Sequence, residues 1–344
     1  MQAHSSTPLS DLSAAYRPLI EAELKTCISV VQTPGLEEMH AMLIYHMGWE
    51  GQGAGVQASG KRIRPILTLL VASATSGGEW RQAIPAAAAV ELVHNFSLIH
   101  DDIEDHSPLR RGRPTVWNLW GIPQAINAGD ALFTLAHLAV FKLERTCSAA
   151  VALESARILQ ATCLHLTQGQ YLDMSYENRR DLFISDYWPM VAGKTAALLS
   201  ACCELGALAG SSLPEVCQVY REFGRNLGLA FQVQDDLLGI WGEPLLTGKS
   251  AESDLVSGKK SLPILFGLEQ RGQFYDRWLH GPISAGEVIE LAALLEAEGA
   301  REFAQAEADR LTHQAMSTLG SAAPEGLAGE ALLELSNWLL NRKT

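Results

Sequence analysis

The chain has 344 residues, of which 47% are hydrophobic and 19% charged, and its formal net charge is −13. This balance is typical of a soluble globular protein, and the acidic excess argues against binding to nucleic acid or to anionic membrane surfaces. The six cysteines form no CxxC pair, so we expect reduced thiols and a cytoplasmic protein. We also expect neither a signal peptide nor a transmembrane segment, because no stretch approaches about 18 uninterrupted apolar residues.

The order of the apolar segments predicts an all-α protein. Residues 1–47 are expected to form one or two helices, interrupted near Pro34-Gly35, and residues 48–60 form a glycine-rich loop. Helical patterning begins again at Arg64-Pro65, where proline suits a first helical turn. We find no strand-like alternation of useful length. The sequence therefore predicts one large helical bundle around a central cavity, a single domain over residues 1–344. It divides into N-terminal helices and the loop (1–60), a catalytic core (61–263) and C-terminal helices (264–344).

An aspartate-rich stretch ends one apolar helical run. It reads Asp101-Asp-Ile-Glu-Asp105 and follows a run that includes Leu98 and Ile99. On a helical wheel Asp101 and Asp105 lie one turn apart on the same face, and like charges at this spacing repel. The alternative is an exposed acidic end of a helix, but the apolar neighbours indicate burial, and acids are unfavourable at a C-terminal helix dipole. The stretch therefore predicts a cation site.

A second stretch, Asp235-Asp-Leu-Leu-Gly239, ends another apolar run. Buried carboxylates are costly unless a cation meets them. Two such clusters facing each other would make an oxygen-lined site for several Mg²⁺ ions. Mg²⁺ that is held by few carboxylates and many waters usually awaits a phosphate group. The two stretches together predict an enzyme that acts on a diphosphate.

Basic residues accompany both acidic stretches at positions from which they could bind phosphate oxygens. A lysine within an apolar helix is unusual without an acidic partner, and a basic, glycine-containing loop could close over phosphates. The alternatives are solvated basic turns and, for the helical lysine, a side chain that extends to solvent. These residues are Lys61 and Arg64 before the first stretch, Arg110 and Arg111 after it, Lys194 in the helix, and Lys249 and Lys259 in the loop.

Taken together, these residues resemble the trans-isoprenyl diphosphate synthase (polyprenyl synthetase) family. The resemblance covers residues 60 to 263 and rests on GKRIRP, ELVHNFSLIHDDIEDHSPLRRGRPT, GQYLD, GKT, FQVQDD and the GK…DL…GKKSLP loop. It implies the all-α isoprenoid synthase fold, usually as a homodimer, with a deep apolar tunnel under the metal site. It also implies condensation of isopentenyl diphosphate with an allylic diphosphate, assisted by three Mg²⁺ ions.

The resemblance assigns roles position by position. The Mg²⁺ ligands would be Asp101, Asp102, Asp105 and Asp235, with Asp236 acting through water. The allylic diphosphate would be held by Arg110, Lys194, Lys249 and Lys259. Isopentenyl diphosphate would be held by Lys61, Arg64, His94 and Arg111. Thr195 and Gln232 would lie near the allylic cation, and the chemistry requires no Ser/His/Asp-type nucleophile.

Two further positions bear on the product and on the metals. In this family the residues four and five positions before the first aspartate help to set the floor of the tunnel, and here they are Ser97 and Phe96. This pattern predicts geranylgeranyl diphosphate (C20), with farnesyl diphosphate (C15) next. Gly239 replaces the last aspartate of the family's second motif. We expect Asp235 still to bind metal and Gly239→Asp to be tolerated.

Two other functions are compatible with parts of the pattern. A class I terpene cyclase, which acts on a single prenyl diphosphate, shares the fold and often has a degenerate second motif. A cyclase would have lost the pocket for the second substrate, yet Lys61, Arg64, His94 and Arg111 are all present. A non-catalytic partner subunit would have a broken first motif, and this one is intact.

Overall fold

The computed structural model describes residues 7–177, 179–242 and 254–340, and most of them are helical. The all-α prediction is therefore confirmed. The chain forms two compact units: unit 1 is residues 1–161, 201–218 and 323–332, and unit 2 is the remainder. The prediction of a single domain stays a prediction. Four helices contribute residues to both units: α9 (Ala149–Tyr176), α11 (Ala197–Ala209), α12 (Pro214–Trp241) and α19 (Gly326–Leu340).

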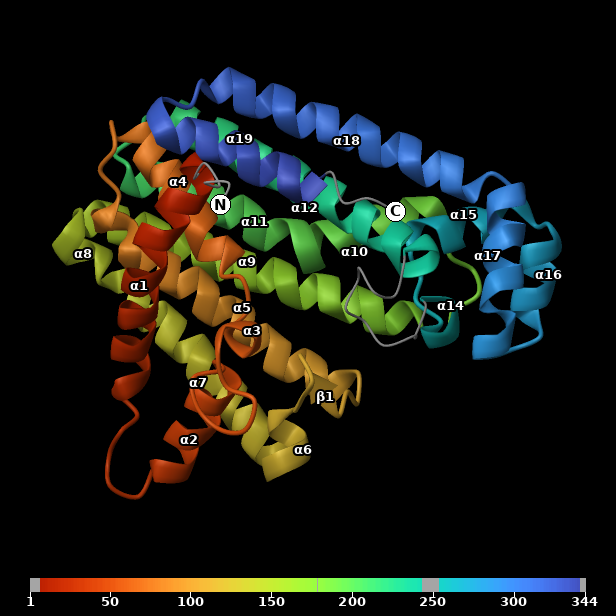
Figure 1. The fold of residues 1–344 in the computed structure, drawn as a ribbon, viewed down its shortest axis with the longest axis horizontal. Helices are drawn as coiled ribbons and strands as arrows, with labels where there is room; N and C mark the ends of the chain where they lie inside the picture. Colours follow the sequence, from red (N-terminus) through yellow and green to blue (C-terminus); the bar gives the residue numbers. More distant parts are fainter. Residues whose placement is uncertain (1–6, 178, 243–253, 341–344) are drawn as a thin grey trace, which may run out of the picture. The chain divides into compact units, whose positions relative to one another are not determined.

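The first eight helices and one hairpin belong to unit 1 (Figure 1). The predicted interruption after the first helix and the helical restart near Pro65 are both present. The elements are α1 (Pro8–Ser29), α2 (Glu37–His46), α3 (Val56–Ser59), α4 (Ile63–Thr75), the 3₁₀ turn η1 (Arg81–Ala83), α5 (Ile84–Glu104), β1 (Leu109–Arg110), β2 (Arg113–Pro114), α6 (Val116–Trp120), α7 (Ile122–Phe141) and α8 (Leu143–Thr146).

Helix α5 is the centre of unit 1 and packs most extensively against α7. Pro85 occupies its first turn, where a missing N–H costs nothing, and the run Ala86–Ala89 is fully buried. Gly129 of α7 lies directly against the ring of His100, and a Cβ there would overlap that ring. Small residues thus let the two helices approach closely, and α5 ends at the first acidic stretch.

Unit 2 contains the helices that carry the second acidic stretch and those that follow it. Its core contains Ile240, Leu255, Ile264, Phe274 and Leu295, all buried. Besides its parts of the shared helices, the elements are α10 (Ile184–Val191), η2 (Ala192–Ala196), α14 (Asp254–Ser257), α15 (Leu262–Gln270), α16 (Gln273–Leu279), the 3₁₀ turn η3 (Ala285–Glu287), α17 (Val288–Ala297) and α18 (Ala300–Ala322).

The segment η2 is a π-type turn between α10 and α11, and it holds Gly193, Lys194 and Thr195. Such turns inside a helix are uncommon and often occur at functional sites. Gly169 of α9 lies against this turn, so that a Cβ on Gly169 would be 2.6 Å from the carbonyl carbon of Gly193. Direct contact between two backbones therefore fixes the position of the turn.

One stretch of the described chain, Ile184–Ala209, is long and apolar enough by composition to cross a membrane. It comprises α10, η2 and α11. More than half of its apolar window, 56%, is buried inside the protein, and Lys194 in its interior forms an ion pair with Asp173. The stretch is therefore a core helix.

We expect Gly169→Ala to destabilise the protein by about 1–3 kcal/mol, the usual range for overpacking a tight contact. Gly320→Ala is the matched control, because Gly320 lies within α18 and an added Cβ would meet nothing within 4 Å. Alanine is the better helix former by about 1 kcal/mol, so the control should be neutral or stabilising. Urea unfolding followed by circular dichroism measures both variants, and equal stabilities would contradict the close contact.

Candidate active site

The first acidic cluster lies at the C-terminal end of α5 in unit 1. Asp101 and Asp105 expose part of their side chains, whereas Asp102 is only 2% exposed. Burial raises the pKa of the Asp102 carboxyl to about 6, although the neighbouring guanidinium of Arg110 acts in the opposite direction. The end of a helix also carries partial negative charge. A cation is therefore the partner that this end of α5 requires.

A short hairpin brings Arg110 to this cluster. Strands β1 and β2 are antiparallel, and Arg111 and Gly112 between them have positive φ angles of 53° and 73°. Arg110 donates from Nε to Oδ1 of Asp102 at 2.7 Å and from Nη2 to Oδ2 of Asp101 at 3.1 Å. A predicted diphosphate ligand and two predicted metal ligands therefore lie in one ion-paired cluster.

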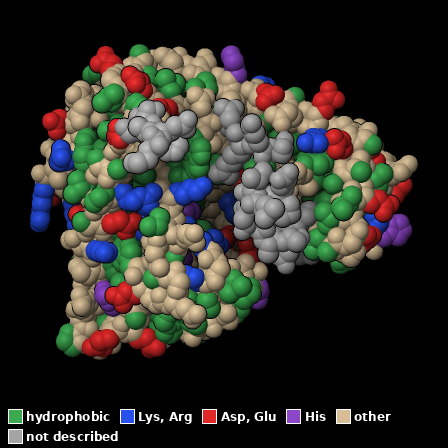
Figure 2. Space-filling view, in the orientation of Figure 1, with side chains coloured by type: hydrophobic (Ala, Val, Ile, Leu, Met, Phe, Trp, Pro, Cys, Tyr) green, Lys and Arg blue, Asp and Glu red, His purple; other side chains and the backbone are tan. Residues whose placement is uncertain are grey.

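The four residues predicted for isopentenyl diphosphate line one pocket of unit 1, with a volume of about 340 Å³. Figure 2 shows Lys and Arg side chains gathered on the surface near α1 and the turn before α4. The turn before α4 is held by Arg17 of α1, which donates to the carbonyls of Gly60 and Lys61 at 3.3 and 2.9 Å. The structure thus brings together Lys61, Arg64, His94 and Arg111.

Arg64 and His94 are in direct contact inside this pocket. Nη1 of Arg64 lies 3.1 Å from Nε2 of His94. Burial and then the charge of Arg64 hold the pKa of His94 well below its usual value, so the neutral ring accepts the hydrogen bond. Nε of Arg64 is buried and has no hydrogen-bond partner within the described chain. A buried donor without a partner is costly, and an anion in the pocket would satisfy it.

Arg62, which the sequence analysis did not single out, organises the turn between Lys61 and Arg64. Its backbone is left-handed (φ 52°) and the residue is 3% exposed. Nε donates to Oε1 of Glu21 and Nη1 to Oε1 of Glu91, both at 2.7 Å. Glu91 lies one turn before His94 on α5. A glutamate within an apolar helix was the only sign in the sequence that this residue has a role in the site.

The second acidic cluster lies in unit 2, on α12, and lines a smaller pocket of about 80 Å³. Lys194 and Lys259, which the sequence predicts to bind the allylic diphosphate, line the same pocket. Asp173, Tyr187 and Asp254 line it as well. Lys194 forms an ion pair with Asp173, the aspartate of the GQYLD stretch. The predicted cations and acids of this half therefore converge.

A chain of hydrogen bonds links three of the predicted residues. Thr195 donates from Oγ1 to Oε1 of Gln232 at 2.7 Å, and Gln232 donates from Nε2 to Oδ1 of Asp236 at 2.9 Å. The other oxygen of Asp236 accepts from Tyr187 at 2.7 Å and from the backbone of Leu262 at 3.0 Å. Burial is the main cause that raises the pKa of Asp236 to about 7. Asp236 is thus fixed by three protein donors, which suits a supporting role.

The loop lysines differ in placement. Lys259 is exposed and lines the pocket, whereas Lys260 is buried and donates from Nζ to the carbonyls of Glu177 and Gly258. Lys249 lies outside the described residues. Lys259 is therefore the described member of this loop that can reach an anion.

The aspartates of the two acidic clusters suit Mg²⁺, which needs few protein ligands. They do not form a site in which protein side chains alone surround a metal ion. Among residues 7–177, 179–242 and 254–340, no three His, Cys, Asp or Glu side chains converge closely enough to hold a metal ion. Mg²⁺ is commonly held by one or two carboxylates and completed by water and substrate phosphates. Aspartates beside phosphate-binding cations provide this arrangement.

The expectation that Gly239→Asp is tolerated stays a prediction, and the structure shows what the added side chain would meet. A Cβ on Gly239 would lie 2.7 Å from Cγ of Asp254 and would overlap its carboxylate. Asp254 is 8% exposed, so its short side chain has little room to move. The expectation treated position 239 as open, and sequence spacing gave no sign that a residue 15 positions later fills it.

The two residues predicted to set chain length lie on α5. The ring of Phe96 packs edge-on against Phe133 of α7, with centroids 5.1 Å apart, and contacts His100 at 5.8 Å. Ser97 donates to the carbonyl of His94 at 2.8 Å and is half-buried. Phe96 therefore belongs to the α5–α7 contact.

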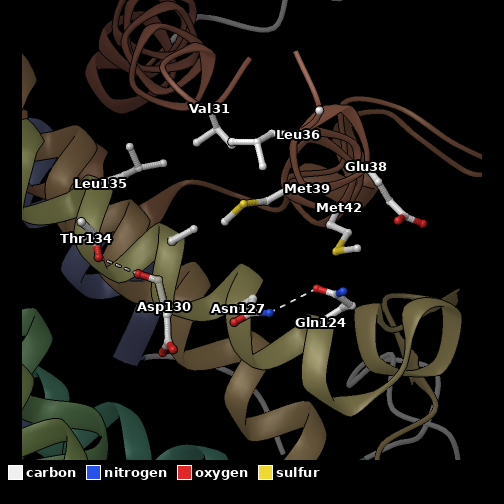
Figure 3. A pocket seen from close by; sticks show the side chains of 12 residues that line it. Val31, Leu36, Glu38, Met39, Met42, Gln124, Asn127, Asp130, Thr134 and Leu135 are labelled. Carbon is white, nitrogen blue, oxygen red and sulfur yellow. Dashed lines mark hydrogen bonds between the residues drawn. The ribbon is translucent and has the colours of Figure 1, made fainter. Parts of the chain in front are cut away.

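Unit 1 also has a wider depression of about 630 Å³ between the segment 31–42 and α7 (Figure 3). Met39 and Met42 of α2 point into it, with Leu135 on the facing helix. Asn127 donates to Gln124 at 3.2 Å on the same side. None of the residues predicted for catalysis lines this depression, so it is separate from the pockets above.

Comparison with known proteins supports the reading of the motifs. The family model described as polyprenyl synthetase matches residues 53–290. The chain is 38% identical over 314 residues to a geranylgeranyl diphosphate synthase of Mycobacterium tuberculosis, covering 89% of this chain and 87% of that protein. It is equally identical, over 315 residues, to a (2E,6E)-farnesyl diphosphate synthase of Mycobacterium bovis, covering 89% and 86%.

Solved structures match over nearly the full length. A polyprenyl synthetase from Streptomyces coelicolor matches with a TM-score of 0.85 and 34% identity, over 96% of this chain and 99% of that one. A polyprenyl synthase from Caulobacter crescentus, complexed with calcium and isoprenyl diphosphate, matches with a TM-score of 0.79 and 26% identity, over 97% and 98%. From the motifs, the pockets and these matches together, the chain belongs to the polyprenyl synthetase family.

Proposed function

We propose that this enzyme condenses isopentenyl diphosphate with an allylic diphosphate and releases mainly geranylgeranyl diphosphate, with farnesyl diphosphate next. As a family member it is a short-chain trans-isoprenyl diphosphate synthase, and the family binds divalent metal ions with its diphosphate substrates. The observation that carries the proposal is the pocket of Lys61, Arg64, His94 and Arg111. A cyclase, which uses one diphosphate, has no need of a second cation-lined pocket.

The metal ligands in this proposal are the predicted aspartates, with three ions per site. Asp101, Asp105 and Asp235 carry the direct contacts, since their side chains are partly exposed. Asp102 is buried beside Arg110, and Asp236 is held by protein donors, so both position their neighbours. When bound, the ions neutralise the charge that develops on the departing diphosphate.

The chain's own residues provide the rest of the chemistry. Arg110, Lys194 and Lys259, with Lys249, hold the allylic diphosphate and stabilise the leaving group electrostatically. The hydroxyl of Thr195 donates a hydrogen bond to Gln232. The lone pairs of its oxygen are therefore left to face the allylic carbocation. The cation pocket of unit 1 holds isopentenyl diphosphate for attack by its double bond. The proton that is then lost goes to the released diphosphate.

A homodimer is the assembly we propose. Helix α7 exposes Ile122, Ile126, Leu138 and Phe141, each more than two-fifths exposed. Apolar side chains repeated along one helix are typical of a surface that a partner covers.

The six cysteines are all unpaired and five are buried, which suits a reducing cytoplasm.

Purified protein with Mg²⁺, isopentenyl diphosphate and an allylic diphosphate should form an elongated prenyl diphosphate. Asp101→Ala and Asp235→Ala should each lower turnover by at least about 100-fold, because losing a metal ligand removes several kcal/mol of charge stabilisation. Radiolabelled isopentenyl diphosphate and chromatography of the products measure both. Asp309→Ala, on the surface of α18, is the control and should retain activity. Diphosphate release from the allylic substrate alone, with a hydrocarbon product, would establish a cyclase.

Glu91→Gln should raise the KM for isopentenyl diphosphate about 10-fold, the equivalent of about 1.4 kcal/mol. The amide keeps a hydrogen-bond acceptor for Arg62 but removes the charge that fixes the turn between Lys61 and Arg64. The KM for the allylic substrate should change less than about 2-fold, because that substrate binds elsewhere in our proposal. Steady-state kinetics with each substrate varied in turn provides the measurement. Equal changes in both KM values would contradict a role in this pocket alone.

Ser97→Phe should shorten the products, because a large ring would occupy the space that a growing chain needs. Phe96→Ala should lengthen them if Phe96 closes the tunnel. Since Phe133 packs edge-on against Phe96, Phe133→Ala should loosen the same wall and act in the same direction. Chromatography of dephosphorylated products gives the chain lengths. Wild-type products of C30 or longer would show that these residues do not set the floor.

A further inference from the structure

The hairpin after the first acidic stretch carries a third arginine, Arg113, to which the proposed function gives no role. Its side chain is largely buried, and the residue is 8% exposed. All three nitrogens of its guanidinium donate to backbone carbonyls: Nε to Gln52 at 2.9 Å, Nη1 to Tyr45 at 2.9 Å and Nη2 to Glu50 at 2.7 Å. Arg113 therefore joins the hairpin to the end of α2 and to the first half of the glycine-rich loop.

The loop wraps closely around this side chain. The guanidinium carbon of Arg113 lies 4.0 Å from the ring centroid of Tyr45, whose hydroxyl donates to the carbonyl of Pro114 at 2.8 Å. Gly51 has a positive φ of 86°, and a Cβ there would lie 3.2 Å from Nη2 of Arg113. A glycine-rich segment loses much conformational entropy when it is ordered. The hydrogen bonds of Arg113 offset part of that cost.

The second half of the loop reaches the pocket that we assign to isopentenyl diphosphate. It packs against the first half, because a Cβ on Gly48 would lie 2.5 Å from the carbonyl carbon of Ala58, and the N–H of Gly55 donates to the carbonyl of Gly48 at 3.0 Å. The carbonyl of Ala58 accepts from Nη1 of Arg111 at 2.7 Å. Arg111 lines the pocket, so direct contacts run from Arg113 through the loop to a group in the pocket.

We propose that Arg113 is a positioning residue for the second substrate. It fixes the glycine-rich loop so that the carbonyl of Ala58 holds Arg111 in the orientation that binds isopentenyl diphosphate. The proposal rests on the proposed function, since it depends on what this pocket binds. Lysine cannot replace Arg113, because an ammonium is a point charge, whereas the three carbonyls surround a planar fork.

The first pair of variants tests the arginine itself. Arg113→Lys keeps the positive charge and the apolar stem but removes the fork. Arg81→Lys is the matched control, because Arg81 also belongs to unit 1 and also packs on an aromatic ring, 4.6 Å from the centroid of Trp80, but is exposed.

The second pair tests another link of the same path without changing Arg113. Gly48→Ala forces the two halves of the loop apart. Gly77→Ala is its control, because Gly77 has a similar positive φ, 70° against 78°, but a Cβ there would meet nothing within 4 Å. Both substitutions strain the backbone, and only the first crowds the loop.

Steady-state kinetics with each substrate varied in turn is the first measurement. Arg113→Lys and Gly48→Ala should each raise the KM for isopentenyl diphosphate about 10-fold and the KM for the allylic substrate less than about 2-fold. The kcat should fall less than about 3-fold, because saturating substrate restores the orientation of Arg111. The double variant should be less impaired than the product of the single effects, because both changes act on one path. The two controls should match the wild type.

Amide hydrogen exchange without substrate, followed by mass spectrometry, is the second measurement. In Arg113→Lys, exchange in residues 48–58 should become at least about 10-fold faster, while α5 keeps its protection. This pattern separates release of the loop from a general loss of stability. If Arg113→Lys does not fold, Gly48→Ala carries the same kinetic and exchange tests.

The inference fails if a folded Arg113→Lys variant has the wild-type KM for isopentenyl diphosphate, even where the loop exchanges faster. It also fails if both KM values rise equally or if exchange becomes faster throughout unit 1, since either result shows a general structural role. A wild type that does not consume isopentenyl diphosphate would overturn the proposed function, and this inference with it. If the wild type condenses both substrates and Arg113→Lys is unchanged, the function stands and only the inference is lost.

Discussion

The free-energy cost of burying charge governs the arrangement of the active-site residues. A carboxylate or guanidinium inside a helical protein is unfavourable unless partners satisfy it. Several of the charged groups described here meet that requirement within their own unit. Arg62 lies between Glu21 and Glu91, Arg110 bridges Asp101 and Asp102, and Lys194 pairs with Asp173. These partners also fix the orientation of groups in the proposed site, so the same contacts that permit burial would organise the proposed chemistry.

The residues that we propose to meet the substrate could be selected from the sequence, because they stand in short motifs with strict spacing. Asp101 and Asp102 at the end of α5 are both hydrogen-bonded to Arg110, and the four residues predicted for isopentenyl diphosphate line one pocket. The helical class followed in the same way from composition and apolar periodicity. The solved structures of the family match this helical fold over nearly the full length.

The residues that support the motifs could not be predicted, since their partners are distant in the chain. Arg62 is held by Glu21, 41 positions earlier, and Tyr187 donates to Asp236, 49 positions later. No local pattern encodes such pairs. Gly239 shows a related difficulty. Its motif is local in the sequence, but the side chain that fills the space beside it belongs to Asp254, 15 positions later. Product length is also beyond the motifs, because relatives named for C20 and C15 products are equally similar to this chain.

The π-type turn at Ala192–Ala196 has a consequence for how this region can vary. Such a turn contains one residue more than a regular α-helical turn, so α10 and α11 differ in rotational phase about their common path. Removing a single residue would let the segment continue as a regular α-helix and would change the register in which the turn presents its own side chains. Lys194 and Thr195 would then no longer share a face with the partners that they have on α9 and α12. Substitutions can accumulate along this helix, whereas its length between Tyr187 and Ala201 is held to a fixed number of residues.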